Sequence, residues 1–138
     1  MEDKTFTWKK FLTRYFIHGL NGMALGLFCT LIVGLIIKQV GSFIGGDIGT
    51  FIVSIGTVAS ICTGAVIGIG VAYSMGAPRL VILSSALTGL MGANAAGFMA
   101  GTLLVDGAVT LTGAGDPLGA FIAVVAGVEL GNLVSGKT

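Results

Sequence analysis

Small residues recur at every fourth position between residues 56 and 76, in a stretch that is otherwise almost entirely apolar. We call these positions the small-residue ladder: Gly56, Ser60, Gly64, Gly68, Ala72 and Gly76. Residues four apart lie along one ridge of an α-helix, so the ladder forms a groove that a second backbone can approach closely. This small-xxx-small packing associates helices inside a bilayer, where no hydrophobic effect drives them together. The ladder therefore predicts a membrane protein built from tightly packed helices.

The geometry of the ladder also predicts which helix is central. Four residues turn an α-helix by about 400°, so successive positions drift by about 40° around the axis. The positions from Gly56 to Gly68 are then expected to face one neighbouring helix, and Ala72 and Gly76 to face another. The helix that carries the ladder should therefore contact at least two others.

The composition supports a membrane protein. Hydrophobic residues make up 54% of the 138 residues and charged residues 9%, whereas soluble domains are about 25% charged. So few charges could not cover the apolar surface of a soluble domain. The net charge of +1 gives no support to nucleic-acid binding. We interpret Cys29 and Cys62, which lie in apolar stretches, as small buried thiols rather than a disulfide.

Four apolar stretches reach the length of about 18 to 20 residues that crosses a bilayer. They comprise residues 20–37, 48–73, 80–105 and 117–134. Short segments with Gly, Pro and Asp separate them, as is typical of loops. Asp116 and Pro117 predict an N-cap followed by proline in the first turn of the fourth helix. Without a repeat or a linker, residues 19–138 are expected to form a single transmembrane domain.

Residues 1–18 are expected to form an amphipathic helix at the membrane surface. Aromatic and apolar residues from Trp8 to Phe16 follow helical spacing, with basic residues on the other face. Such a helix lies flat among the headgroups, and no small-residue site for signal-peptide cleavage follows the apolar run. The expected fold class is an all-α integral membrane protein with about four transmembrane helices after an interfacial amphipathic helix.

The distribution of charge predicts the orientation. If the chain crosses four times, six basic residues share one side: Lys4, Lys9, Lys10, Arg14, Arg79 and Lys137. The other side receives Lys38 and the acidic residues Asp47, Asp106 and Asp116. By the positive-inside rule both termini are expected to be cytoplasmic.

The third stretch is unusual because glycines and Asn94 occupy its middle. Glycine costs about 1 kcal/mol relative to alanine in a helix interior. Two interpretations remain open. The span is broken or re-entrant and exposes backbone groups to a substrate cavity, or its small residues serve close helix packing.

Glu129 is the one carboxylate inside an expected span. A charge there costs at least ~2.5 kcal/mol on insertion scales, so it should face the protein interior, a wet cavity or a partner. It lies roughly 8 Å in depth from the cytoplasmic end of its helix, at 1.5 Å per residue. Contact with a substrate or proton and an ion pair with Arg79, on the same side, both remain open.

Other motifs give no sign of catalysis. Residues 131–138 match the phosphate-binding pattern GxxxxGK[ST] formally, but no following helix would supply the amides that hold phosphate. We interpret this segment as the end of the fourth helix and His18 as an interface residue. One histidine and two separated cysteines do not make a usual zinc site. We therefore expect no enzyme activity, no metal and no cofactor.

Three segments carry a family resemblance: Leu20–Phe28 (LNGMALGLF), Ile69–Gly89 (IGVAYSMGAPRLVILSSALTG) and Gly119–Thr138 (GAFIAVVAGVELGNLVSGKT), the last preceded by Asp116 and Pro117. They resemble the perfringolysin O regulator-like membrane proteins, which are related to the EIIC permease component of bacterial sugar phosphotransferase systems. The resemblance implies a membrane-embedded module of an EIIC-like permease in the bacterial plasma membrane. Such a module would translocate a small polar solute and work with cytoplasmic phosphotransferase components.

On this interpretation the substrate lies near the interrupted third span, with Asn94 and Glu129 as its contacts. Members of the family are usually longer, which implies a truncated half or a unit that assembles with copies of itself or with a second membrane subunit. The alternatives are a membrane regulator or assembly subunit that transports nothing, and a small oligomeric pore.

Overall fold

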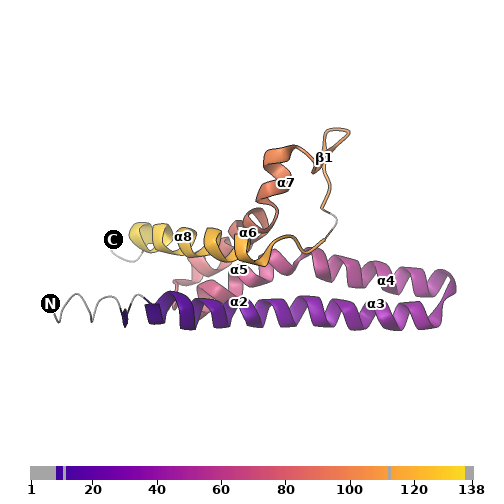
Figure 1. Cartoon of the computed structure of the whole chain (residues 1–138), viewed down its shortest axis with the longest axis horizontal. Helices are drawn as coiled ribbons and strands as arrows, with labels where there is room; N and C mark the ends of the chain where they lie inside the picture. The colour runs from indigo at the N-terminus through magenta and orange to yellow at the C-terminus, as the bar shows by residue number, and fades with distance from the viewer. Residues whose placement is uncertain (1–8, 11, 112, 136–138) are drawn as a thin grey trace.

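The structure is a computed structural model that describes residues 9–10, 12–111 and 113–135 and is almost entirely helical (Figure 1). Its elements are η1 (Thr13–Gly19), α2 (Leu20–Leu27), η2 (Phe28–Ile32), α3 (Val33–Ile44), α4 (Gly46–Ile61), α5 (Thr63–Ser74), α6 (Arg79–Ala93), α7 (Ala95–Ala100), β1 (Leu104–Val105), β2 (Ala108–Val109) and α8 (Pro117–Ser135). The two η segments are π-helical turns within the first helix.

The first four elements form one continuous helix, Thr13–Ile44, of 32 residues. At 1.5 Å per residue it is about 48 Å long, so it contains the expected first span and extends beyond it. Gly45, with φ of 67°, ends the helix, and α4 returns antiparallel to α3 (Figure 1).

The helix does not break where the surface segment was expected to end. Gly19 keeps right-handed helical backbone angles, with φ of −65° and ψ of −49°, so residues 13–18 continue the axis of the first span. The expected boundary between residues 1–18 and 19–138 is therefore not seen in the described residues. Residues 1–8 and 11 lie outside them, and an interfacial orientation of this segment stays a prediction.

The second span consists of two helices, α4 and α5, which meet at an angle of 42°. Cys62 makes the bend, with φ of −74° and ψ of −3°. The expected second span, residues 48–73, is therefore a bent pair of helices. The prediction that this span is central is confirmed, since α4 packs against α3 while α5 packs against α2, α6 and α8.

The expected interruption of the third span occurs at Asn94, with φ of −110° and ψ of 12°. α6 ends before it, and α7 turns away from the other helices (Figure 1). The helical part ends at Ala100 rather than at residue 105, because Gly101 adopts the left-handed conformation with φ of 72°. The short hairpin β1–β2 follows, in which Leu104 pairs with Val109.

The fourth span begins as the sequence predicts. α8 starts at Pro117, and the Asp116 carboxylate accepts a hydrogen bond from the Leu118 N–H at 3.0 Å. This bond caps one of the N–H groups that lack a partner in the first turn of a helix.

The packing has an apolar exterior and a core that includes small polar residues. Ile67, Val71, Val124 and Val128 are fully buried, together with the hydroxyl residue Thr63. Large apolar side chains are exposed on every long helix, with Phe43 88% exposed. An exposed apolar surface of this extent fits a protein that is surrounded by lipid.

Length and apolar character identify two candidate membrane spans, Thr13–Ile44 and Pro117–Ser135, and a third if the bent pair α4–α5 counts as one. α6 is apolar but has only 15 residues, below the length of about 20 that crosses a bilayer. The expected class of all-α membrane protein is confirmed, with two or three candidate spans in place of the four expected.

Candidate functional site

An ion pair joins the N-terminal helix to the last helix. The Arg14 guanidinium donates from Nε to the Oε1 of Glu129 at 3.2 Å, and its Nη2 lies 3.2 Å from the same oxygen. The Tyr15 phenol also interacts with this carboxylate. The two charged side chains are 40% and 42% exposed, so solvent screens the pair.

Glu129 therefore has a different partner from the expected Arg79. On α8, Gly127 contacts Thr88 and Gly131 contacts Val81, so these glycines face α6. Two residues turn a helix by about 200°, which places Glu129 on nearly the opposite side, toward η1. Arg79 is exposed at the start of α6, on the side of α8 that Glu129 does not face.

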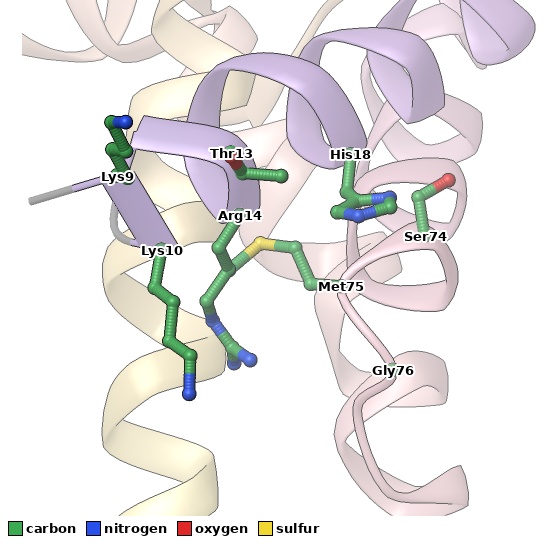
Figure 2. Close-up of a pocket in the computed structure, with 8 residues that line it drawn as sticks. All are labelled: Lys9, Lys10, Thr13, Arg14, His18, Ser74, Met75 and Gly76. Carbon is green, nitrogen blue, oxygen red and sulfur yellow. The ribbon is translucent and has the colours of Figure 1, made fainter. Parts of the chain in front are cut away.

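A groove of about 600 Å³ lies beside this ion pair (Figure 2). One wall is the N-terminal helix and the other is the end of α5 with the following turn. The residues that line it are Lys9, Lys10, Thr13, Arg14, His18, Ser74, Met75 and Gly76. Three of them, Lys9, Lys10 and Arg14, are cationic. Arg14 contacts the acidic residue Glu129.

Sequence reasoning assigned Lys9, Lys10 and Arg14 to a membrane-surface helix and His18 to the interface. It did not predict that they share a groove with Ser74 and Met75. The positive-inside pattern placed the N-terminal helix and the turn after α5 on one side of the membrane. That pattern gives the side of the membrane but does not show that the two segments are in contact.

Asn94 uses its side chain to end α6. Its Nδ2 donates to the Leu90 carbonyl at 2.9 Å. The break is also attached to the start of α8, because the Asp116 N–H donates to the Ala93 carbonyl at 2.7 Å. Gly92 and Gly119 bring the two backbones together, since a Cβ on Gly92 would lie 2.6 Å from the Gly119 oxygen. The end of one helix thus meets the beginning of another.

A second cavity, of about 570 Å³, lies beside this break. α6, α7 and α8 line it with the residues Leu87, Thr88, Met91, Gly92, Ala95, Phe98, Met99 and Ala123. Its one polar side chain, Thr88, donates to the Ser84 carbonyl of its own helix at 3.3 Å. The walls of this cavity are therefore apolar.

The structure does not bring Asn94 and Glu129 together. Asn94 adjoins the start of α8, whereas Glu129 lies near its other end, roughly 20 Å away along the axis at 1.5 Å per residue. The two candidate substrate contacts do not form one site within the described chain.

The small-residue ladder changes partner at the bend. Gly56 packs on α3, where a Cβ would lie 2.7 Å from the Gly34 oxygen. Gly64 packs on α6, where a Cβ would lie 2.9 Å from the Gly89 oxygen. The expectation that both face one helix is therefore wrong, because the bend at Cys62 redirects the groove.

The remaining ladder positions have different surroundings. Gly68 also faces α6, where its carbonyl accepts a hydrogen bond from the buried Ser85 hydroxyl at 3.0 Å. Ser60 is buried on α4 and Ala72 is fully buried on α5. A Cβ on Gly76 would meet nothing within 4 Å among the described residues, and its φ of 73° forms the turn after α5.

Cys29 and Cys62 are free but exposed on the helix surface rather than buried. In the described part of the chain no three His, Cys, Asp or Glu residues gather as a metal site would require.

Comparison with known proteins identifies the family. The sequence model of the family described as "Phosphotransferase system, EIIC" matches residues 17–138. No curated protein and no solved structure matches the chain. EIIC proteins are membrane components of sugar transport that act with other components of the phosphotransferase system. The match covers most of the chain, from within the first apolar helix onward, so the protein belongs to the phosphotransferase system EIIC family.

Proposed function

We propose that the protein is a module of an EIIC-type permease that translocates a small polar solute across the bacterial plasma membrane. The observation that carries this proposal is the break at Asn94, which lies inside the family match and against the capped start of α8. Interrupted helices with ends that meet inside a bundle are typical of the substrate sites of transporters.

The polar groups at the break suit an uncharged polar solute. The end of α6 presents backbone carbonyls, while at the start of α8 Pro117 has no N–H and the Leu118 N–H is held by Asp116. The Asn94 amide and the exposed Asp116 carboxylate lie at the same place. Sugars offer hydroxyl groups that both donate and accept hydrogen bonds, so they can pair with such a mixture.

The chain supplies only part of a polar site, because the adjoining cavity has apolar walls. A second surface is needed to enclose a polar solute. We therefore propose that a second copy, or another membrane subunit, completes the pathway opposite the break. In this arrangement Asn94 contacts the substrate. The bond between Glu129 and Arg14 holds Glu129 near the entrance of the solute pathway.

The charges at the two ends of the bundle support cytoplasmic termini. The N-terminal helix and α6 both begin at the end of the bundle where α8 finishes (Figure 1). Lys9, Lys10, Arg14 and Arg79 belong to these helix beginnings. Lys38 lies toward the other end, near the turn between α3 and α4. By the positive-inside rule the end with the four cations faces the cytoplasm, where phosphotransferase partners would receive the solute. Phosphoryl transfer is then the work of those partners rather than of this chain.

The resemblance of residues 69–89 and 119–138 to the perfringolysin O regulator-like proteins supports placement in that branch of the family. A regulator that transports nothing is the competing function. Uptake by proteoliposomes that contain the purified chain, measured by mass spectrometry over a panel of hexoses and hexitols, separates the two. Accumulation of a sugar above that in empty liposomes supports transport. If no sugar accumulates even when a stoichiometric membrane partner copurifies and is reconstituted with the chain, the proposal is wrong.

A further inference from the structure

We infer that the groove lined by Lys9, Lys10, Arg14 and His18 binds the phosphate-bearing headgroup of an anionic phospholipid. This inference goes beyond the transport function and does not depend on it. The observations that carry it are the charge of the groove, its shape and its position on the helix.

The charge of the groove suits a phosphate. Lys9, Lys10 and Arg14 bring three cationic side chains to the lining, and Arg14 also contacts Glu129. Both lysines are exposed. Thr13 and Ser74 add hydroxyl groups to the walls. Hydroxyl donors and ammonium groups together satisfy the oxygens of a phosphodiester.

The position of the groove indicates a lipid rather than a soluble anion. Farther along the same helix, just after Arg14 and Tyr15, Phe16 is 57% exposed and Ile17 is 62% exposed. The basic residues therefore lie where the apolar surface of a membrane helix begins, which is the depth of the headgroups. An acyl chain could extend from the groove along these apolar side chains while its phosphate contacts the lysines.

The two walls come from segments far apart in the sequence. The N-terminal helix carries the cations, and the end of α5 closes the groove with Ser74, Met75 and Gly76 (Figure 2). Gly76 turns the chain with φ of 73°, which keeps the wall short and leaves the groove open to the headgroup region. Single basic residues on a helix surface would attract anionic lipid only diffusely, whereas two walls define a place for one headgroup.

The sole tryptophan of the chain, Trp8, adjoins Lys9 in the sequence and serves as a native probe. The full chain is reconstituted in phosphatidylcholine vesicles that contain an equal minor fraction of either brominated phosphatidylglycerol or brominated phosphatidylcholine. Quenching of the tryptophan then reports the local preference for the anionic lipid. We expect stronger quenching by phosphatidylglycerol. Each lysine should contribute roughly a fivefold preference for the anionic lipid. The variant Lys9→Gln/Lys10→Gln should therefore lose most of the preference.

The matched control is Arg79→Gln, which removes an exposed cation from the same end of the bundle but outside the groove. It should retain the preference. Equal quenching by the two lipids in the unmodified chain would overturn the inference. Equal losses in Arg79→Gln and the lysine variant would also overturn it, because the attraction would then be diffuse. Loss of the preference on adding inorganic phosphate at constant ionic strength would assign the groove to a soluble phosphate instead.

Discussion

The Arg14 guanidinium lies 3.2 Å from the Glu129 carboxylate and joins residues that are 115 positions apart in the sequence. This contact attaches the beginning of the described chain to its last helix. It also lies at the edge of the groove that Lys9, Lys10, Arg14 and His18 line. The contact therefore gives Glu129 a structural role at the end of the bundle, away from the break at Asn94.

The Arg14–Glu129 pair should contribute little to stability because both side chains are more than a third exposed. Partly exposed ion pairs contribute about 0.2–1 kcal/mol. A double-mutant cycle with Arg14→Gln, Glu129→Gln and the double variant, followed by thermal unfolding in detergent, should give a coupling in this range that weakens with added salt. A coupling well above this range would mean that the pair is buried in the assembled protein.

Replacement of Gly68 by alanine should destabilise the protein. A Cβ there would meet the Ser85 backbone carbonyl, and such overpacking costs about 1–3 kcal/mol. That cost exceeds the gain of up to about 1 kcal/mol from helix propensity. We expect a lower midpoint of thermal unfolding, measured by circular dichroism.

The matched control for this substitution is Gly127→Ala. At Gly127 the nearest atom to an added Cβ is the Thr88 side-chain methyl, at 3.1 Å, which can move. The midpoint of Gly127→Ala should stay the same or rise. If the two variants behaved alike, the close approach of α5 and α6 would be refuted.

Removal of the Thr63 hydroxyl should not weaken the fold. Thr63 is fully buried, and its Oγ1 has no hydrogen-bond partner among the described residues. Since a buried hydroxyl without a partner costs about 1–3 kcal/mol, Thr63→Val should raise the unfolding midpoint.

Thr30→Val provides the comparison, because the Thr30 hydroxyl donates to the Gly26 carbonyl at 2.8 Å. Its removal should lower the midpoint slightly, in line with about 0.5–1.5 kcal/mol for a hydrogen bond. A large loss of stability in Thr63→Val would show that another molecule satisfies this hydroxyl in the membrane.

The cap at the start of α8 gives a prediction of its own. Asp116→Ala removes the acceptor for the Leu118 N–H and should cost about 1 kcal/mol. Asp116→Asn should be close to neutral because asparagine caps as well as aspartate. Hydrogen exchange of the first turn of α8 measures the effect locally. Equal protection in the two variants would show that the cap does not order the turn.

Local features of the fold could be predicted from the sequence because they depend on neighbouring residues. The cap at Asp116 and Pro117 follows from the preferences of those residue types. The interruption at Asn94 was one of two interpretations that the glycines of the third stretch left open. The class of protein followed from its charge content, and the central position of the second span from the small-residue ladder.

Features that depend on contacts between distant segments could not be predicted. The bend at Cys62 lies in an apolar run without proline, so the residue types there did not indicate a break. The partner of Glu129 depends on which face of α8 meets the N-terminal helix. The opposite face of α8 is occupied by α6 through Gly127 and Gly131, and only the packed structure shows this.

The central claim is that a polar solute passes beside the break at Asn94. The most direct measurement compares uptake of the accumulated sugar by proteoliposomes that contain the unmodified chain, Asn94→Leu or Asn132→Leu. Asn132 lies on α8 near its end, away from the break, and controls for replacing an amide by an apolar side chain. We predict that Asn94→Leu lowers the uptake rate at least tenfold at equal protein content, whereas Asn132→Leu retains it. Equal uptake by Asn94→Leu and the unmodified chain would contradict the account.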